Sequence, residues 1–281
     1  MNALELDKLT LAAEKSRRNV LRMVAAAHHG HLGGALSCID IASALYFYKM
    51  NIRPEDPKWE DRDRFILSAG HKCMAQYAVL AERGYFDKSV LDTYGSLKSP
   101  IPGHPDMYKL PGIEANTGAL GHGLSIAAGM ALGLRAEGKT SKVYVVMGDG
   151  ELAEGSVWEG AMAGPNFGLD NLCAIVDRNR LQISGSTEDV MVQDSQEERW
   201  AAFGWNVLSI DGNDLTAIDA ALTLAAETKG KPTVIIANTI KGYGSPVMEN
   251  KAPWHHQLPN AEQYAQITAD FAARKEAVLR G

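Results

Sequence analysis

The sequence contains few cysteines, no excess of positive charge and no long apolar run. Its three cysteines, Cys38, Cys73 and Cys173, are too few and too widely spaced for a disulfide framework or a Cys-x-x-Cys metal clip. Reduced cysteines in the core of a cytoplasmic protein are the simplest interpretation. The net charge is −6, without a basic stripe, which argues against a nucleic-acid partner bound through phosphate neutralisation.

Membrane and targeting signals are also lacking. No apolar run approaches the ~18 residues of a membrane span, and the first 19 residues alternate between acidic and basic side chains, unlike a signal peptide. We therefore expect a surface helix there, no membrane contact and a cytoplasmic location.

Repeats, low-complexity tracts and blocks of like charge are absent too, so nothing marks a domain boundary. A chain of 281 residues with 46% hydrophobic residues is long enough to form one large core. We expect a single domain over 1–281, in which a helical segment over 1–30 and a loop with a C-terminal helix over 240–281 are integral parts.

Short apolar runs alternate with helical patterns along the chain. The runs carry apolar residues almost continuously, as strands covered on both faces do; they are 64–68, 142–148, 171–177, 205–211 and 232–238. The alternation predicts an α/β fold with a mostly parallel, doubly wound sheet flanked by helices.

A Gly-Asp-Gly sequence follows the second of these runs. Ligands of an open parallel sheet bind at the carboxyl ends of its strands, where Asp149 lies. Gly148 and Gly150 allow a sharp turn and a close approach of the backbone to a ligand. An aspartate in such a loop can instead serve only as a helix cap.

Asn179 follows the next strand and favours the ligand-binding alternative for Asp149. Neighbouring parallel strands bring their carboxyl ends together, so the Asp149 carboxylate, the Asn179 amide oxygen and a backbone carbonyl near Leu181 form a partial set of oxygen ligands. Mg²⁺ or Ca²⁺ prefers such ligands, with positions left for water and diphosphate oxygens.

A glycine-rich segment, "NTGALGHGLSIAAG", leads into a predicted helix. The backbone N–H groups around Gly118, Gly121 and Gly123 could hold an anion at the helix start. Such a loop is weak evidence by itself, but together with the metal ligands it indicates a diphosphate cofactor.

These residues resemble the thiamine-diphosphate-binding half of transketolases. Further segments extend the resemblance in the same order along nearly the whole chain: "HHGHLGGALS", "RDRFILSAGH", "PGHPD", "GALGHG" and "IKGYG" followed by "WHH". Two departures are Leu32, where proline is usual, and His122, which replaces glutamine.

The resemblance implies the thiamine diphosphate-binding fold and a site for thiamine diphosphate with Mg²⁺, or with Ca²⁺ or Mn²⁺ in its place. It assigns the metal to Asp149, Asn179 and Leu181. The implied cofactor contacts are His71, Gly118, Leu120, Gly121, His122, Gly148, Asp149, Gly150, Glu154, Asn179 and Ile183.

The resemblance also implies a reaction and its histidines. The cofactor supplies the chemistry that cleaves a ketose between C2 and C3 and passes the two-carbon fragment to an aldose. His31, His71 and His104 are assigned to the substrate cleft, and the double histidine leaves open whether His255 or His256 takes the last position. Neutral imidazoles suit this task because they both donate and accept protons near neutral pH.

The acidic residues after Asp149 are predicted to have different roles. Glu154 and Glu159 lie about 140° apart around a helix, so they cannot serve one site from one face. By resemblance, Glu154 lies at a subunit interface that links two cofactor sites. Glu159 belongs either to the same network or to a capping box with Ser156 as its N-cap. Glu151 is expected only to favour the positive helix start.

A full-length transketolase continues with a pyrimidine-binding domain and a C-terminal domain, whereas this sequence ends at Gly281. We therefore expect the N-terminal subunit of a split transketolase, inactive alone and active as a heterotetramer of two such chains with two C-terminal transketolase subunits. Pentose phosphates, a branched sugar phosphate and a sulfonated sugar remain open as substrates. Alternative functions are a subunit of another thiamine diphosphate enzyme, resembling deoxyxylulose-phosphate synthase or a dehydrogenase E1, and a non-catalytic regulatory subunit.

Overall fold

Five parallel strands form one sheet in the order β1-β2-β3-β5-β4 in the computed structural model, which describes residues 1–193 and 195–280. Each predicted strand is confirmed, with its ends within one residue of those expected. The strands are β1 Arg64–Leu67, β2 Val143–Gly148, β3 Leu172–Arg178, β4 Asn206–Asp211 and β5 Thr233–Asn238. The doubly wound α/β fold expected from the alternating pattern is therefore confirmed.

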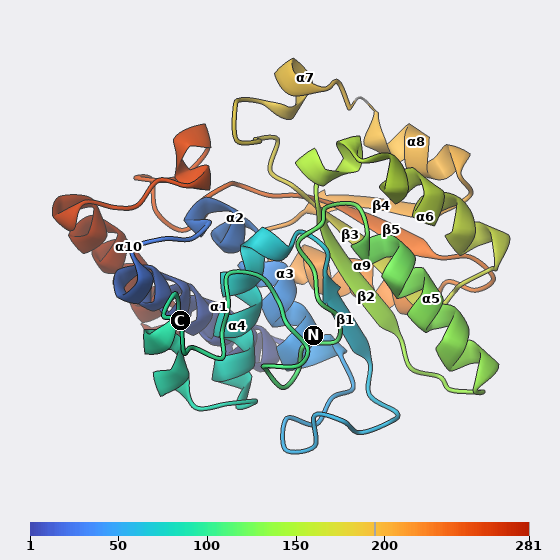
Figure 1. Cartoon of the computed structure of the whole chain (residues 1–281), viewed down its shortest axis with the longest axis horizontal. Coiled ribbons are helices and arrows are strands. Elements are labelled where there is room, and N and C mark those ends of the chain that lie inside the picture. The colour runs from blue at the N-terminus through green and yellow to red at the C-terminus, as the bar shows by residue number, and fades with distance from the viewer. Residues whose placement is uncertain (194, 281) are drawn as a thin grey trace.

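Helices cover both faces of the sheet (Figure 1). Alternate residues of β2 point in opposite directions, so that Tyr144 and Val146 join one apolar cluster and Val145 and Met147 join the other. One cluster contains the inner faces of α1 Ala3–Ala27, α2 Leu32–Ser37, α3 Ile39–Ala44, α4 Cys73–Arg83, α9 Leu215–Glu227 and α10 Ala261–Arg280. The other contains those of α5 Gly123–Ala136, α6 Gly155–Asn166 and α8 Gln196–Ala202, while the short helix α7 spans Thr187–Val190.

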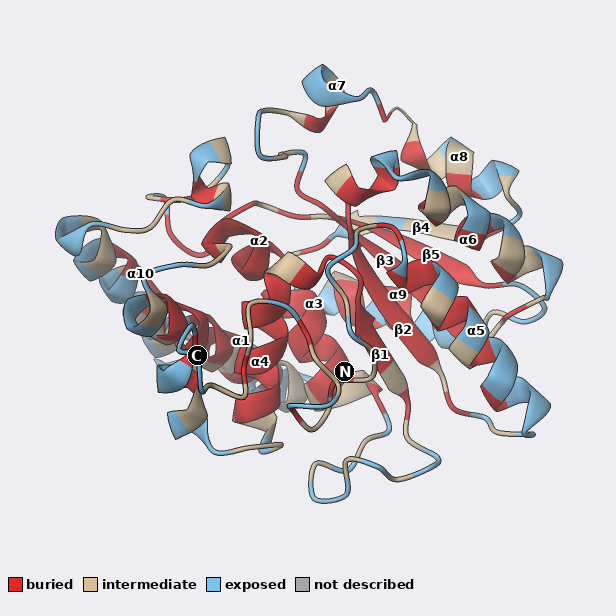
Figure 2. Cartoon of the chain, in the orientation of Figure 1, coloured by how far each residue is buried: buried red, intermediate tan, exposed pale blue. Residues whose placement is uncertain are grey.

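Burial follows this layering. Figure 2 shows β1, β2, β3 and β5 as largely buried, whereas the edge strand β4 is intermediate to exposed and the outer sides of α5 and α10 are exposed. The three cysteines are free and buried, as the sequence predicts. None of the helices in the described ranges combines the length and the low charge needed to cross a bilayer.

The expectation of a simple surface helix at the N-terminus is wrong. Arg17, in the middle of α1, is fully buried. Its guanidinium pairs with Asp40 of α3 and, at 3.2 Å, with Glu14. The alternating charges of this segment therefore include a buried ion-pair network between α1 and its neighbours, which charge pattern alone does not distinguish from a solvated face.

The carboxyl ends of four strands meet at one edge of the sheet. Leu67 of β1 pairs with Val146 of β2, and Gly148 of β2 pairs with Asp177 of β3. On the other side of β3, Arg178 pairs with Asn238 of β5. The loops that follow these strands therefore leave the sheet side by side and carry the residues of the site.

Candidate active site

A cavity of about 350 Å³ lies at this edge of the sheet. Its lining includes most of the site residues expected from the sequence: His31, His71, Gly118, Leu120, Gly148, Asp149, Gly150, Asn179, Leu181, Ile183, His255 and His256. The lining does not include His104, Gly121, His122 or Glu154. The lining also contains residues that the sequence did not single out, above all Lys72, Gln182, Ser184 and Lys241.

Oxygen atoms from the ends of β2 and β3 form the part of the cavity next to the sheet. Asp149 is only 2% exposed and makes no ion pair with any residue that the structure describes. Its carboxylate accepts hydrogen bonds from the backbone N–H groups of Gly150 at 2.8 Å and Arg180 at 2.5 Å. Burial raises the pKa of Asp149 to about 6, although the charge of Lys72 opposes this shift.

Asn179 and Leu181 add two further oxygen atoms. The Asn179 Oδ1 atom accepts a hydrogen bond of 3.1 Å from the Leu181 N–H, and the Leu181 carbonyl accepts one of 3.1 Å from the Lys241 Nζ atom. A buried carboxylate without a counter-ion, next to an amide oxygen and a carbonyl, is a donor set that fits a hard divalent cation. The residues present therefore suit the predicted metal.

The role expected for Glu151 is wrong. The side chain does not serve the start of α6; it is buried and accepts hydrogen bonds from the N–H groups of Gly121 at 2.8 Å and Gly148 at 3.1 Å, and from the Ser68 hydroxyl. Ser68 directly follows β1, Gly148 is the last residue of β2 and Gly121 lies in the glycine-rich segment. Glu151 thus fixes these three segments to one another, and burial raises its pKa.

The capping box proposed for Ser156 and Glu159 is also wrong. Helix α6 begins at Gly155, with Glu154 as an N-cap that makes no side-chain hydrogen bond to the helix. The chain leaves a short 3₁₀ turn at Gly150–Ala153 and enters α6 before it reaches Ser156. Glu154 and Glu159 are both exposed in the single chain, and their interface roles remain predictions.

The glycine-rich segment packs closely against its neighbours. Gly121 has a φ of 84°, and a Cβ atom there would lie 2.4 Å from the Ser156 Oγ atom. A Cβ atom on Gly118 would lie 3.1 Å from the ring of His104, which is exposed. His122 is also exposed, with its Nδ1 atom 3.1 Å from the Leu120 carbonyl oxygen. The roles of His104 and His122 therefore remain predictions.

A buried ion pair beneath the cavity was not foreseen. The Lys72 Nζ atom lies 2.6 Å from Asp177, which is 0% exposed and also accepts hydrogen bonds from Ser37 at 2.5 Å and from Thr239. Burial by itself would lower the pKa of Lys72, but Asp177 more than offsets this and raises it. The partners are 105 positions apart, so no local pattern connects them.

Lys241 is a second buried cation that the sequence did not single out. It is 2% exposed, and its Nζ atom lies 3.1 Å from both the Leu181 carbonyl oxygen and the His255 Nδ1 atom. Within the described ranges it forms no ion pair. Burial and the charge of Lys72 lower its pKa to about 8. A buried cation on a cavity wall without a carboxylate partner suits an anionic group of a ligand.

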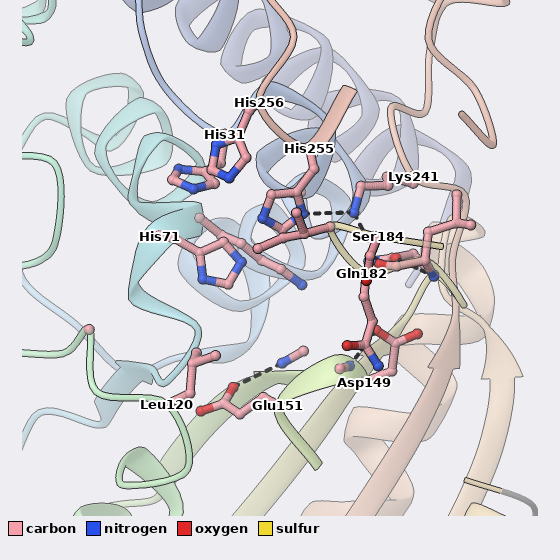
Figure 3. A pocket seen from close by; sticks show the side chains of 18 residues that line it. His31, His71, Leu120, Asp149, Glu151, Gln182, Ser184, Lys241, His255 and His256 are labelled. Atoms are coloured by element: carbon pink, nitrogen blue, oxygen red, sulfur yellow. Dashed lines mark hydrogen bonds between the residues drawn. The ribbon is translucent and has the colours of Figure 1, made fainter. Parts of the chain in front are cut away.

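Four histidines line the rest of the cavity (Figure 3). The ring of His31 lies 4.4 Å from that of His256 and 5.0 Å from that of His71, centroid to centroid. Burial and neighbouring positive groups lower the pKa of His31 to about 4, that of His255 to about 3 and that of His71 to about 2. The imidazoles of these last three residues are therefore neutral at pH 7, and each can donate from one nitrogen and accept at the other.

The lowered pKa values of the half-buried histidines predict a loss of stability of the isolated chain in acid. In the unfolded chain His31 titrates near pH 6.5, but in the folded chain it titrates near 4. Within this window the unfolded state binds more protons, so the free energy of unfolding falls as the pH falls. Asp149 acts in the opposite direction because its pKa is raised.

A comparison with His31→Gln isolates the contribution of this histidine. Urea denaturation at pH 7.5 and at pH 5 should show a smaller loss of unfolding free energy for the variant than for the wild type. Equal losses in the two proteins would show that His31 is not kept neutral by the fold.

Comparisons with known proteins agree with this geometry. Residues 9–276 match the family described as "Transketolase, thiamine diphosphate binding domain". The chain is 46% identical, over 97% of both chains, to an apulose-4-phosphate transketolase subunit of Phocaeicola vulgatus. It is 41% identical to a 6-deoxy-6-sulfo-D-fructose transketolase subunit of a Clostridium species, over 86% of this chain and 88% of that one.

Solved structures show the same fold. The transketolase of Leishmania mexicana superposes with a TM-score of 0.89 at 30% sequence identity, over 97% of this chain and 44% of that one. The transketolase of Campylobacter jejuni superposes with a TM-score of 0.89 at 30% sequence identity, over 99% of this chain and 46% of that one. The chain thus spans less than half the length of these transketolases. It belongs to the transketolase family, of which it contains the thiamine diphosphate binding domain.

Proposed function

We propose that this chain is the diphosphate-binding subunit of a split transketolase that transfers a two-carbon ketol unit from an anionic ketose to an aldose. One observation carries the proposal. A single cavity combines the oxygen ligands of Asp149, Asn179 and Leu181, the buried cation of Lys241 and a group of neutral histidines. A metal–diphosphate group fits the oxygen ligands and Lys241, and the hydroxyl and carbonyl groups of a sugar fit the histidines.

Asp149, Asn179 and the Leu181 carbonyl would hold Mg²⁺, and Ca²⁺ or Mn²⁺ would suit the same oxygen ligands. Lys241 would donate to a diphosphate oxygen. When bound, thiamine diphosphate supplies the carbon nucleophile that breaks and remakes the bond next to a carbonyl carbon. Contacts of the cofactor with the other predicted residues are part of the same proposal: His71, Gly118, Leu120, Gly121, His122, Gly148, Gly150, Glu154 and Ile183.

The histidines would bind the sugar and move its protons. His31, His71 and His256 line the cavity, and His104 lies beside Gly118 at its edge. The Nδ1 atom of His255 faces Lys241, so we place His255 toward the diphosphate. His256 is exposed, and we place it at the entrance, where it would contact a hydroxyl of the donor sugar.

The partner proposed for the chain is a C-terminal transketolase subunit that carries the pyrimidine-binding domain, in an assembly of two plus two chains. Three relatives carry the word "subunit" in their names, which supports a partner of this kind. The same names make apulose-4-phosphate the first donor to test, and 6-deoxy-6-sulfo-D-fructose the second. Cytoplasmic location stays a prediction.

Ketol transfer by the reconstituted pair tests the proposal. The chain and its partner are mixed with thiamine diphosphate, Mg²⁺, each ketose donor and an aldose acceptor, and the new ketose is measured. We expect transfer from at least one anionic ketose by the pair and none by either chain alone. Consumption of pyruvate in place of a ketose would favour another thiamine diphosphate enzyme, and no turnover of any donor would contradict the proposal.

Substitution of Lys241 separates ligand binding from folding. Lys241→Met removes a charged hydrogen-bond donor to the diphosphate, a loss of about 1.5–3 kcal/mol, so the pair should bind thiamine diphosphate tenfold or more weakly. The variant chain should unfold at the same urea concentration or a higher one, because a buried unpaired charge has been removed. Lys251→Met, on the exposed part of the same loop, is the matched control. A variant with full affinity would contradict the role of Lys241.

A further inference from the structure

We infer that His31, His255 and His256 form a site for a transition-metal ion, Zn²⁺ in particular, at the mouth of the cavity. Each of the three residues offers a ring nitrogen, and these nitrogens all lie within 4.8 Å of one another. The ring centroids are 4.4 Å apart for His31 and His256, 4.6 Å for His255 and His256, and 5.2 Å for His31 and His255. This group is distinct from the oxygen ligands next to the sheet.

The spacing is close to that of a tetrahedral zinc site. With Zn–N distances of about 2.0–2.1 Å, three nitrogens of a tetrahedron lie about 3.3 Å from one another. Closing the remaining gap requires rotations of the rings about their side-chain torsions. His256 is exposed and His31 and His255 are only half-buried, so the rings can adjust and an ion can reach them from solvent.

The ligand type selects the ion. Imidazole nitrogens suit Zn²⁺, Cu²⁺ and Ni²⁺, whereas Mg²⁺ takes oxygen ligands. The cavity therefore offers Asp149, Asn179 and the Leu181 carbonyl to a hard cation and the three histidines to a softer one. The cysteines do not compete for zinc, because all three are buried.

Lys241 weakens this site. Its Nζ atom lies 3.1 Å from the His255 Nδ1 atom, and because an ammonium only donates, this contact places the ring proton of His255 on Nε2. A metal-binding histidine carries its proton on the far nitrogen instead, so an ion at Nε2 requires Lys241 to release the ring, and the charge of Lys241 also repels the ion. We therefore expect micromolar affinity, weaker than that of a dedicated zinc enzyme.

Zinc would compete with the sugar if the proposed function is right. The same three rings are those proposed to contact the substrate or to face the diphosphate, so one group cannot hold an ion and a ketose together. Free zinc should therefore inhibit the enzyme. Only this consequence, and not the metal site itself, rests on the proposed function.

Cobalt spectroscopy tests the site without any activity. Co²⁺ is titrated into the full chain with millimolar Mg²⁺ present, and visible absorption reports four-coordinate binding; Zn²⁺ then displaces it. We expect one Co²⁺ per chain, with affinity reduced at least tenfold in His256→Ala. His256 is exposed, so this variant should remain folded. His28→Asn is the matched control, because His28 is exposed, lies outside the cluster and has a φ of 52° that asparagine tolerates.

The outcomes separate this site from the proposed function. Unchanged Co²⁺ affinity in His256→Ala, or binding without the four-coordinate spectrum, would overturn the site whether or not the pair is active. If the reconstituted pair transfers ketol units, Zn²⁺ should inhibit it in competition with the donor sugar. Histidine-dependent Co²⁺ binding by a chain that shows no ketol transfer with its partner would support the site and contradict the function.

Discussion

Asp149→Asn should weaken the binding of thiamine diphosphate by the assembled pair at least 100-fold, about 2.7 kcal/mol, when Mg²⁺ is present. Asparagine keeps the volume of the side chain and an oxygen for one of the two N–H groups, since Gly150 donates to Oδ1 and Arg180 to Oδ2, but it removes the one charged ligand of the metal. Isothermal calorimetry on the pair measures the effect.

Stability of the variant chain separates lost ligation from misfolding. The Asp149 carboxylate is buried without an ion pair in the described structure and has a raised pKa. Removal of this charge should offset the hydrogen bond lost to one of the two N–H groups, so the variant chain should remain folded and unfold at a urea concentration close to that of the wild type. Asp7→Asn, an exposed substitution on α1, should change neither affinity nor stability. If Asp149→Asn bound the cofactor as tightly as the wild type, the metal assignment would be wrong.

Lys72→Met should destabilise the chain by about 3–5 kcal/mol, because it leaves the carboxylate of Asp177 buried and without a cation. Asp177 is 0% exposed, and its remaining partners, Ser37 and Thr239, are neutral hydroxyls. Chemical denaturation followed by tryptophan fluorescence measures the loss.

A second substitution tests the cause. Asp177→Asn in the Lys72→Met background removes the unbalanced charge. The amide keeps an acceptor oxygen for one of the two hydroxyls and offers an N–H to the other, which can accept it, so most of the lost stability should return. Lys58→Met, on an exposed loop, should be neutral. A loss of less than about 1 kcal/mol for Lys72→Met, or no recovery in the double variant, would show that the ion pair does not stabilise this edge of the sheet.

The fold and much of the site were predictable because their signals are local. A strand of an α/β sheet is covered on both faces, so runs such as 142–148 stand out as apolar, and β2 begins and ends within one residue of that run. Asp149 and Asn179 each follow a strand directly, so the topology of neighbouring parallel strands was enough to bring them together.

The errors and omissions share a different cause. Some contacts form only when the chain folds. Lys72 meets Asp177 across 105 positions of the sequence, and Lys241 meets Leu181 across 60. Glu151 lies among several acids, and nothing in the local sequence shows that its carboxylate turns inward to Gly121 and Ser68. A lysine or glutamate in a sequence suggests a solvated side chain, and only the packed structure reveals the partner that permits its burial.

The central claim is that this chain binds the diphosphate end of a cofactor whose site a partner subunit completes. Titration of the assembled pair with thiamine diphosphate and with thiamine, each with and without Mg²⁺, tests this claim most directly. We predict tight binding of thiamine diphosphate that requires Mg²⁺, and binding of thiamine that is at least 100-fold weaker, about 2.7 kcal/mol, and insensitive to Mg²⁺. Equal affinity for the two compounds, or affinity for thiamine diphosphate that does not depend on the metal, would contradict the account.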